Sequence, residues 1–290
     1  MLLGSCVMKI GKFQVIGNLG MGANSSILHI RRSSDSRQYA LKVVPISGNE
    51  DLKFLTQARH EFRVSRMLDH RNLIKIFALE GQRDWLFRIR KVLLLIEYVN
   101  GQTLDTIKQL PVPKLVQIFG KVAAGMAHMH RQRVFHADLK PNNILLSRSG
   151  EVKIIDYGLA WIKGESKGRV QGTPEYMAPE QAKKMIVNEQ TDIYNLGATM
   201  YRLVTWRLPT NSVLEDDALR LPSQKRNKLL KPVEELNSEA PPELCQLIHQ
   251  CLEIKASRRP ERMGDVQEAL ESLTKTLVRS PEDRLEALEW

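Results

Sequence analysis

The period of the hydrophobic pattern changes near residue 100, and this change constrains the fold of the 290-residue chain more than any other feature. Residues 10–46 contain three stretches rich in β-branched residues and bounded by turn formers, which predicts an antiparallel meander. Residues 50–67 carry apolar side chains at intervals of three and four, which predicts one amphipathic helix. Two more strand-like stretches follow at 72–79 and 92–99, separated by a charged turn region at 80–91.

Helical spacing predominates beyond the segment NGQTL. Helices are predicted at 113–132, 191–205, 242–254 and 265–277, with short strands at 143–147 and 152–156. We therefore predict an α+β fold of two lobes, with a strand-rich N-terminal lobe at 10–99 and a mainly helical C-terminal lobe at 100–278. Residues 1–9 are interpreted as a leader and residues 279–290 as a tail.

The composition is that of an ordinary soluble protein, with 42% hydrophobic and 26% charged residues and a net charge of +10. This charge favours anionic partners without choosing among them, and no apolar run is long enough to cross a membrane. The three cysteines form neither a paired framework nor a CxxC pattern, which favours a reducing, cytoplasmic location. Cys245, His249 and Cys251 lie in a helical apolar pattern, where buried core is favoured over a zinc site.

A glycine pair, Gly20 and Gly22 in LGMGANSSI, is expected in a turn between two strands. Without a Cβ, such a turn lets backbone N–H groups approach a phosphate. Ser25 stands where a third glycine is often found, and its hydroxyl suits the same ligand. The pair by itself is equally compatible with a tight hairpin.

Lys42 lies in the strand-like segment YALKVV among apolar neighbours, so its amine needs a partner. Glu61, in the middle of the predicted helix, is the best candidate. A carboxylate there would hold Lys42 against a pair of phosphates, although a lone helix glutamate is more often solvated.

Three segments of the C-terminal half complete the pattern: HADLKPNN, then IIDYGLA, then GTPEYMAPE. With them the chain resembles the eukaryotic-like (Hanks-type) protein kinase superfamily, and most of all its bacterial serine/threonine kinases, from about Phe13 to Leu277. The matches are Lys42 to the strand lysine of the family, Asp138 and Asn143 to its catalytic loop, residues 156–158 to DFG and residues 178–180 to APE.

The resemblance implies transfer of the γ-phosphoryl group of ATP to a serine or threonine of a protein substrate, autophosphorylation included. It implies that Asp138 accepts or orients the hydroxyl proton and that Lys140 offers charge to the γ-phosphate. Asn143 and Asp156 would bind Mg²⁺, with Mn²⁺ as the alternative. Lys42, oriented by Glu61, would hold the α- and β-phosphates. No nucleic-acid partner is predicted.

The resemblance also places adenine between the lobes. The Glu97 carbonyl and the Val99 backbone would bond the purine edge, and Ile96 occupies the gatekeeper position. The ring would be sandwiched by apolar side chains, namely Ile27, Ala40 and Leu145. These residues are equally compatible with ordinary core, because nucleotide pockets are mostly apolar.

Other matches suggest structural roles. Glu180 and Arg259 resemble the buried ion pair that anchors the end of the activation segment. Asp192, expected to open its helix, resembles the aspartate that braces the catalytic loop. Thr173 is expected to contact Asp138.

Two residues depart from the family pattern. Tyr157 replaces the phenylalanine of DFG, and Ala137 replaces the arginine that commonly pairs with a phosphorylated activation segment. Before Thr173, the only hydroxyl of that segment, apart from Tyr157, is Ser166. We therefore hypothesise that activity depends little on phosphorylation there.

Two other functions stay open: a pseudokinase that binds nucleotide without transfer, and a small-molecule phosphotransferase of related fold. The basic stretch of Arg83, Arg88, Arg90 and Lys91 is interpreted as a solvated turn, with a docking surface as the alternative.

Overall fold

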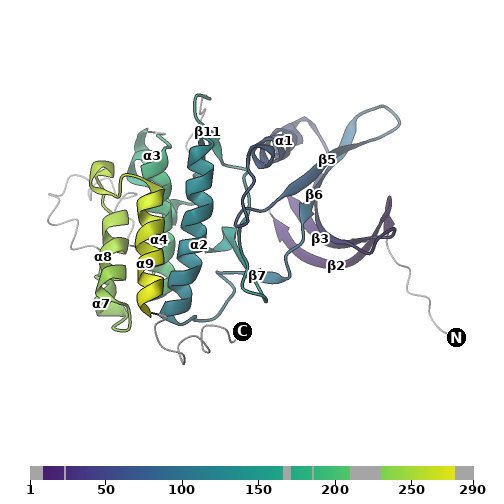
Figure 1. The fold of residues 1–290 in the computed structure, drawn as a ribbon. Helices are drawn as coiled ribbons and strands as arrows, with labels where there is room; N and C mark the ends of the chain where they lie inside the picture. Colours follow the sequence, from purple (N-terminus) through teal and green to yellow (C-terminus); the bar gives the residue numbers. More distant parts are fainter. Residues whose placement is uncertain (1–8, 23, 166–170, 185, 210–229, 278–290) are drawn as a thin grey trace. The chain divides into compact units, whose positions relative to one another are not determined.

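The computed structural model describes residues 9–22, 24–165, 171–184, 186–209 and 230–277. The chain divides into two compact units. The first consists of the residues up to Asp69 together with Ile74–Asn100, and the second of His70–Leu73 with the residues from Gly101 onward. The first unit is a sheet with one helix and the second is mainly helical, so the predicted fold class is confirmed (Figure 1).

The sheet of the first unit has six antiparallel strands in the order β1-β2-β3-β4-β6-β5. They are β1 (Lys9–Ile10), β2 (Phe13–Gly22), β3 (Ser25–Arg32), β4 (Gln38–Pro45), β5 (Ile76–Arg83) and β6 (Ile89–Glu97). One core cluster joins Ile30, Tyr39, Leu41 and Leu93 from its three central strands. The predicted meander over residues 10–46 is therefore confirmed.

The predicted helix is α1 (Leu52–Met67), which follows a 3₁₀ turn at Asn49–Asp51. Its buried residues, Leu55, Ala58, Glu61, Val64 and Ser65, recur at three and four and form one face. This face packs against β5 and β6. The spacing that predicted the helix is thus the spacing of its buried face.

The connection between β5 and β6 is shorter than predicted. The two strands stay paired as far as Arg83 and Ile89, so only residues 84–88 form the turn. The prediction of a turn region over 80–91 was wrong because charged side chains on the solvent side of a hairpin leave its backbone ladder intact. Residues 72–75, predicted as strand, precede β5.

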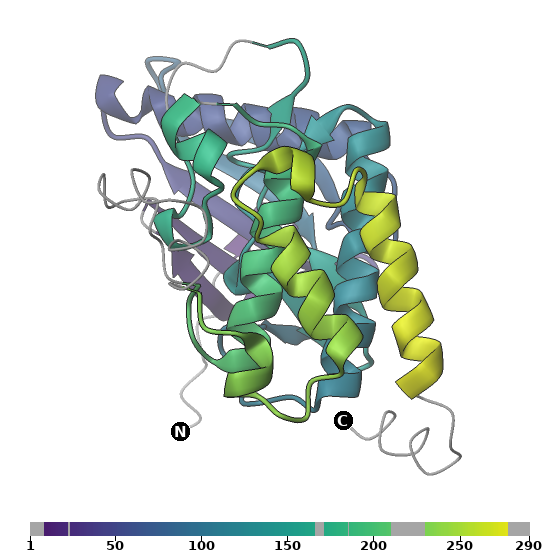
Figure 2. The same ribbon diagram turned by 90° about the vertical axis from the view of Figure 1, so that its left-hand side faces the viewer.

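The second unit contains all four predicted helices: α2 (Val112–Arg131), α4 (Glu189–Thr205), α8 (Pro242–Cys251) and α9 (Met263–Leu277). Helices α2 and α9 lie side by side, and α8 packs on α4 (Figure 2). Helix α4 starts earlier than predicted because Asn188 and Thr191 form a capping box. Asp192 consequently lies within the first turn and does not open the helix.

Short elements complete the second unit. The strands are β7 (Gly101–Thr103), β8 (Val134–Phe135), β9 (Ile144–Ser147), β10 (Val152–Ile154) and β11 (Trp161–Ile162). The short helices are α3 (Pro179–Lys184) and α7 (Val233–Leu236), with 3₁₀ turns at Pro141–Asn143, Pro174–Tyr176 and Ala256–Arg258. Strands β9 and β10 form a hairpin that directly follows the segment HADLKPNN.

The cysteine-containing helix α8 is core. Cys245 and Cys251 are unpaired and buried, and burial raises the pKa of the Cys251 thiol to about 12. The burial of both cysteines confirms their interpretation as core, whereas His249 is partly exposed. Within the described ranges, no group of three His, Cys, Asp or Glu side chains could hold a metal ion. None of the helices described is both long and apolar enough for a membrane span. Cys6, the rest of the predicted leader except Lys9, and the predicted tail lie outside the described residues.

Candidate active site

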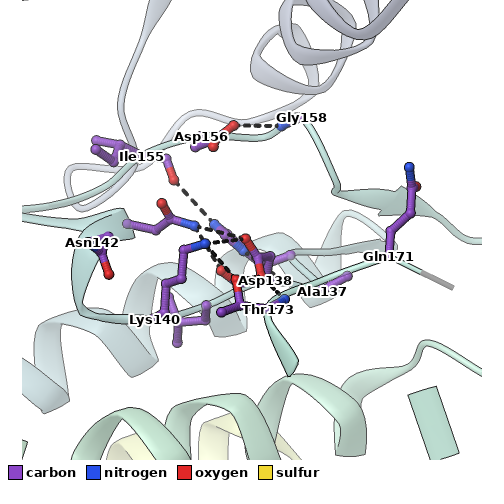
Figure 3. Close-up of polar contacts among 12 residues, drawn as sticks. Ala137, Asp138, Lys140, Asn142, Ile155, Asp156, Gly158, Gln171 and Thr173 are labelled. Carbon is purple, nitrogen blue, oxygen red and sulfur yellow. Dashed lines mark hydrogen bonds and ion pairs between the residues drawn. The ribbon is translucent and has the colours of Figure 1, made fainter. Parts of the chain in front are cut away.

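Asp138 is at the centre of a polar cluster in the second unit (Figure 3). Its Oδ1 accepts hydrogen bonds from the backbone N–H and the hydroxyl of Thr173, both at 2.7 Å. Its Oδ2 lies 3.0 Å from Lys140 Nζ, which also donates to Thr173 Oγ1 at 2.6 Å. The expected contact between Thr173 and Asp138 is confirmed. Asp138 is 8% exposed, and contacts to both of its oxygens hold the carboxylate in position.

Three buried polar residues of α4, Asp192, Asn195 and Thr199, hold the backbone around this cluster. Asp192 accepts the backbone N–H groups of His136 and Ala137, both at 2.8 Å. One and two turns further along, Asn195 donates to Tyr176 O at 2.6 Å and Thr199 donates to Leu139 O at 3.4 Å. The bracing role expected of Asp192 is confirmed. Asn195 and Thr199 were missed, although buried polar residues at three- and four-residue spacing are a readable signal.

His130 in α2 completes the support. Its Nε2 lies 2.8 Å from Asp192 Oδ2 and its Nδ1 lies 3.1 Å from Glu189 Oε1, with its side chain 4% exposed. Burial disfavours the charged imidazole, but the hydrogen bond to Asp192 and the nearby Glu189 carboxylate outweigh it and raise the pKa of His130 to about 9. His130 is therefore an imidazolium at neutral pH, and it neutralises the carboxylate that holds the loop.

Asn143 and Asp156, the predicted metal ligands, flank the β9–β10 hairpin. Asn143 Nδ2 donates to Asp138 O at 2.8 Å, which leaves its Oδ1 as the donor atom for a cation. Asp156 is exposed and has φ of 68°, and its Oδ1 accepts from Gly158 N. The two segments are joined by a bond of 2.9 Å from Ile155 N to Asn143 O. The buried Tyr157 ring stands edge-on to His136.

Gln181 links the loop to the activation segment, and sequence reasoning missed it. Its Nε2 donates to Ala137 O at 2.7 Å and to Gln171 O at 2.9 Å, and the residue is 1% exposed. Gly172 has φ of 138°, and a Cβ there would lie 2.9 Å from Gln181 Nε2. Glycine at this position therefore lets the segment approach the amide closely. Ser166 lies outside the described residues.

Lys42 and Glu61 form an ion pair inside the first unit. Lys42 Nζ lies 2.7 and 2.9 Å from the two Glu61 oxygens. The Glu61 side chain is 3% exposed and that of Lys42 is 20% exposed. The pairing expected from the sequence is confirmed, and Glu61 is not the solvated charge that a lone helix glutamate would be. The Lys42 side chain remains partly exposed while that of its partner is buried.

The glycine pair lies at the end of β2 and not in the turn that was expected. Gly20 pairs with Ile27 and Gly22 with Ser25, so the strand continues through both. Register shifts before Gly17 and before Gly20 bend this strand without ending it. Nothing lies within 4 Å of the place where a Cβ on Gly20 would stand.

The residues expected around adenine belong to both units. In the first unit, Ala40 on β4 is opposite Ile96 on β6, while Ile27 on β3 pairs with Lys42. Glu97 ends β6, and Val99 follows it. In the second unit, Leu145 on β9 is half-buried. Their role toward a purine stays a prediction.

The expected pair of Glu180 and Arg259 is present. It is bidentate, at 2.7 and 3.0 Å, and the Arg259 side chain is fully buried. Arg259 also donates to the carbonyls of Glu253, Gln190 and Ile254. Its guanidinium lies 4.9 Å from the centre of the Tyr194 ring. This pair fixes the end of the activation segment.

Comparison with known proteins identifies the family. Residues 13–273 match the protein kinase domain. The chain therefore belongs to the protein kinase family, and its similarity to curated bacterial relatives makes it a serine/threonine protein kinase domain.

Among the relatives, the serine/threonine-protein kinase PrkC of Bacillus subtilis is 29% identical over 72% of this chain and 32% of its own length. Serine/threonine-protein kinase pkn2 of Myxococcus xanthus is 28% identical over 90% of this chain and 32% of its own length. The inactive serine/threonine-protein kinase PLK5 of Mus musculus is 32% identical over 66% of this chain and 32% of its own length. The chain thus spans about a third of the length of these proteins.

Proposed function

We propose that this domain transfers the γ-phosphoryl group of ATP to a serine or threonine hydroxyl of a protein, with Asp138 as the group that orients and receives the hydroxyl proton. One observation carries the proposal: Asp138, Lys140 and Thr173 converge on one point within hydrogen-bond distance. The unpaired cysteines add the expectation of a cytoplasmic location.

The arrangement suits in-line phosphoryl transfer, which needs positioning and charge neutralisation more than covalent chemistry. Thr173 occupies Oδ1 of Asp138, so Oδ2, which also lies 3.0 Å from Lys140 Nζ, is the oxygen that would receive the proton of the acceptor hydroxyl. As the hydroxyl oxygen attacks phosphorus and the bond to the β-phosphate oxygen breaks, the proton passes to Asp138. Lys140 balances the charge on the moving phosphoryl group.

The residues suit magnesium. An amide oxygen of Asn143 and a carboxylate of Asp156 are hard donors, and Mg²⁺ is usually bound by one or two such groups together with substrate phosphates. When bound, the ion would neutralise phosphate charge. Mn²⁺ has the same ligand preferences.

Lys42 would hold the α- and β-phosphates of the same ATP, because its side chain is partly exposed and carries its charge beside Glu61. The open space beside Gly20 suits a phosphate near the backbone. Ser25, Ile27, Ala40, Ile96, Glu97, Val99 and Leu145 complete the proposed nucleotide contacts.

We also propose that activity depends little on phosphorylation of the activation segment. Gln181 joins Ala137 to Gln171 through neutral hydrogen bonds, and Thr173 joins the same segment to Asp138. These contacts hold Gln171 and Thr173 beside the catalytic loop without a phosphate and without an arginine at position 137. Ser166→Ala, assayed after phosphatase treatment, should retain turnover within about twofold. A strong drop with ATP affinity retained would contradict the proposal.

A transfer assay with γ-labelled ATP and cell extract tests the activity. Label should enter protein serine and threonine, and Asp138→Asn should lower turnover by about 10²- to 10⁴-fold, the usual contribution of a general base. ATP-dependent thermal stabilisation of Asp138→Asn would show that the variant still folds and binds nucleotide.

The same assay decides between the alternatives. The inactive relative shows that similarity to this family is compatible with loss of activity. Nucleotide binding without transfer to any acceptor would identify a pseudokinase, and label in small molecules alone would identify a small-molecule phosphotransferase. The retained Lys42, Asp138 and Asp156 favour the kinase.

A further inference from the structure

The turn between β5 and β6 exposes three consecutive apolar side chains. Trp85 is 85% exposed, Leu86 44% and Phe87 79%. The turn is at the upper right of Figure 1, at the end of the β5–β6 hairpin. Large aromatic side chains this exposed serve no packing function in the first unit. We call residues 83–91 the hairpin tip.

The hairpin tip is held rigidly by Asp84. Its carboxylate accepts the backbone N–H groups of Leu86 and Arg88 at 2.9 and 3.0 Å and the Arg90 Nε at 2.8 Å. Arg83 donates to the Phe87 carbonyl at 2.9 Å. The apolar side chains therefore project from a backbone whose polar groups are largely satisfied internally, which an apolar surrounding requires.

Phe87 adopts a conformation that does not suit it, with φ of 59°. Glycine or asparagine is the usual residue at this position of a short hairpin turn. An aromatic residue here gains nothing for the turn itself. The strained position therefore points to a use for the exposed ring.

Four exposed basic residues flank the apolar side chains in the sequence, namely Arg83, Arg88, Arg90 and Lys91, of which Arg90 is paired with Asp84. Aromatic rings settle at the boundary between lipid headgroups and acyl chains, and nearby Arg and Lys side chains attract anionic headgroups. The two rings contribute roughly 150–250 Å² each. That is less than the about 800 Å² per partner of a stable protein interface, whereas a bilayer needs no complementary shape.

We propose that the hairpin tip attaches this domain to anionic membrane surfaces by inserting Trp85, Leu86 and Phe87 between the headgroups, with the basic side chains against anionic lipid. The attachment is peripheral and reversible, because three side chains bury little area and the attraction weakens as salt screens it. The sequence suggested a docking surface as one alternative for the basic residues of the hairpin tip. In this proposal their partner is the anionic headgroup of a lipid.

Vesicle sedimentation of the intact chain tests the proposal. The chain should sediment with vesicles that mix phosphatidylglycerol into phosphatidylcholine and not with phosphatidylcholine alone. Trp85→Ser/Phe87→Ser and Arg88→Glu/Lys91→Glu should each weaken binding by about tenfold or more. The controls are Leu52→Ser/Met67→Ser and Lys53→Glu/Arg59→Glu, which make the same kinds of change at exposed residues of α1 and should stay within about twofold.

Quenching by brominated lipid locates the contact. Trp85→Phe should retain vesicle binding and lose most of the quenched fluorescence, although three other tryptophans remain. Three results would overturn the proposal: no sedimentation with anionic vesicles, equal losses in the α1 controls, or photo-crosslinking from position 85 to a protein without vesicle binding. Unchanged unfolding temperatures confirm that the tip variants are folded.

Discussion

The Lys42–Glu61 pair of the first unit and the Arg259–Glu180 pair of the second both have a distance of 2.7 Å, but their cations differ in exposure. Arg259 is sealed, with no exposed side-chain surface and bonds to three carbonyls besides Glu180. Lys42 keeps 20% of its side chain exposed while Glu61 is buried beneath it. A sealed cation can only hold the fold together, whereas an open one can also meet a ligand.

The difference implies that the two pairs fail in different ways. Breaking the Arg259–Glu180 pair leaves the Glu180 carboxylate, whose side chain is only 13% exposed, without its cation, so the cost appears in stability. Replacing Lys42 by another cationic residue leaves a positive charge beside Glu61, so we expect the loss in turnover and not in stability.

Removing the sealed cation should have the largest effect. Arg259→Ala should lower the free energy of unfolding by about 3–5 kcal/mol, because the largely buried Glu180 is left without its cation. Urea unfolding followed by circular dichroism measures this loss. Arg259→Met/Glu180→Gln removes both charges and should recover part of it. A loss below about 1 kcal/mol for Arg259→Ala would mean that the pair is not an anchor.

Lys42→Arg tests the open pair while retaining its charge. We expect turnover to fall at least about 100-fold, equivalent to about 2.7 kcal/mol, because the guanidinium cannot place its charge where the amine does. The free energy of unfolding should change by less than about 1 kcal/mol. Arg259→Lys is the reciprocal control, since it should lower stability and leave turnover of the folded fraction near wild type. Equal stability losses in both variants would remove the distinction.

The cluster of His130, Asp192 and Glu189 allows an ion pair to be broken by pH alone. The pKa of His130 is about 9 in the folded state against 6.5 for a free imidazole. The stabilisation is therefore complete below about pH 6.5 and is lost as the pH rises through about 9. Between about pH 7 and pH 9.5 the free energy of unfolding should fall by about 2 kcal/mol. His130→Gln should flatten this profile, and an equal fall in the variant would assign the titration to another group.

Removing the hydrogen bonds that Gln181 donates to Ala137 and Gln171 should give the smallest effect. Gln181→Leu removes one hydrogen bond from the buried Ala137 carbonyl and one from the partly buried Gln171 carbonyl, which should cost about 1–2 kcal/mol of stability. Turnover at a temperature where the variant is folded should fall about tenfold, with KM for ATP unchanged, because the activation segment loses its position. Gln190→Leu removes a similar bond, to Glu261 O at 2.7 Å, and is the matched control. Equal turnover in the two variants would show that Gln181 only stabilises the fold.

Much of the fold followed from local pattern. Apolar spacing at three and four located α1, α2, α4, α8 and α9, because the face that a helix buries recurs with the helical period. The boundaries of elements were predicted less well. The charged residues at 80–91 suggested a turn, although strand pairing continues to Arg83. Helix α4 begins before its predicted start because Asn188 and Thr191 form a capping box. Backbone pairing and capping depend on neighbours in space and on single hydrogen bonds, which an apolar pattern does not record.

For the site, the sequence by itself determined which chemical groups are available: Lys42, Glu61, Asp138, Lys140, Asn143 and Asp156, in an order that fits one family. Only the tertiary structure decided how they are supported. Gln181, Asn195, Thr199 and His130 act through contacts with residues up to 62 positions away. An amide or imidazole of this kind looks unremarkable in a sequence, because its function arises from the carbonyl or carboxylate that folding brings within hydrogen-bond distance.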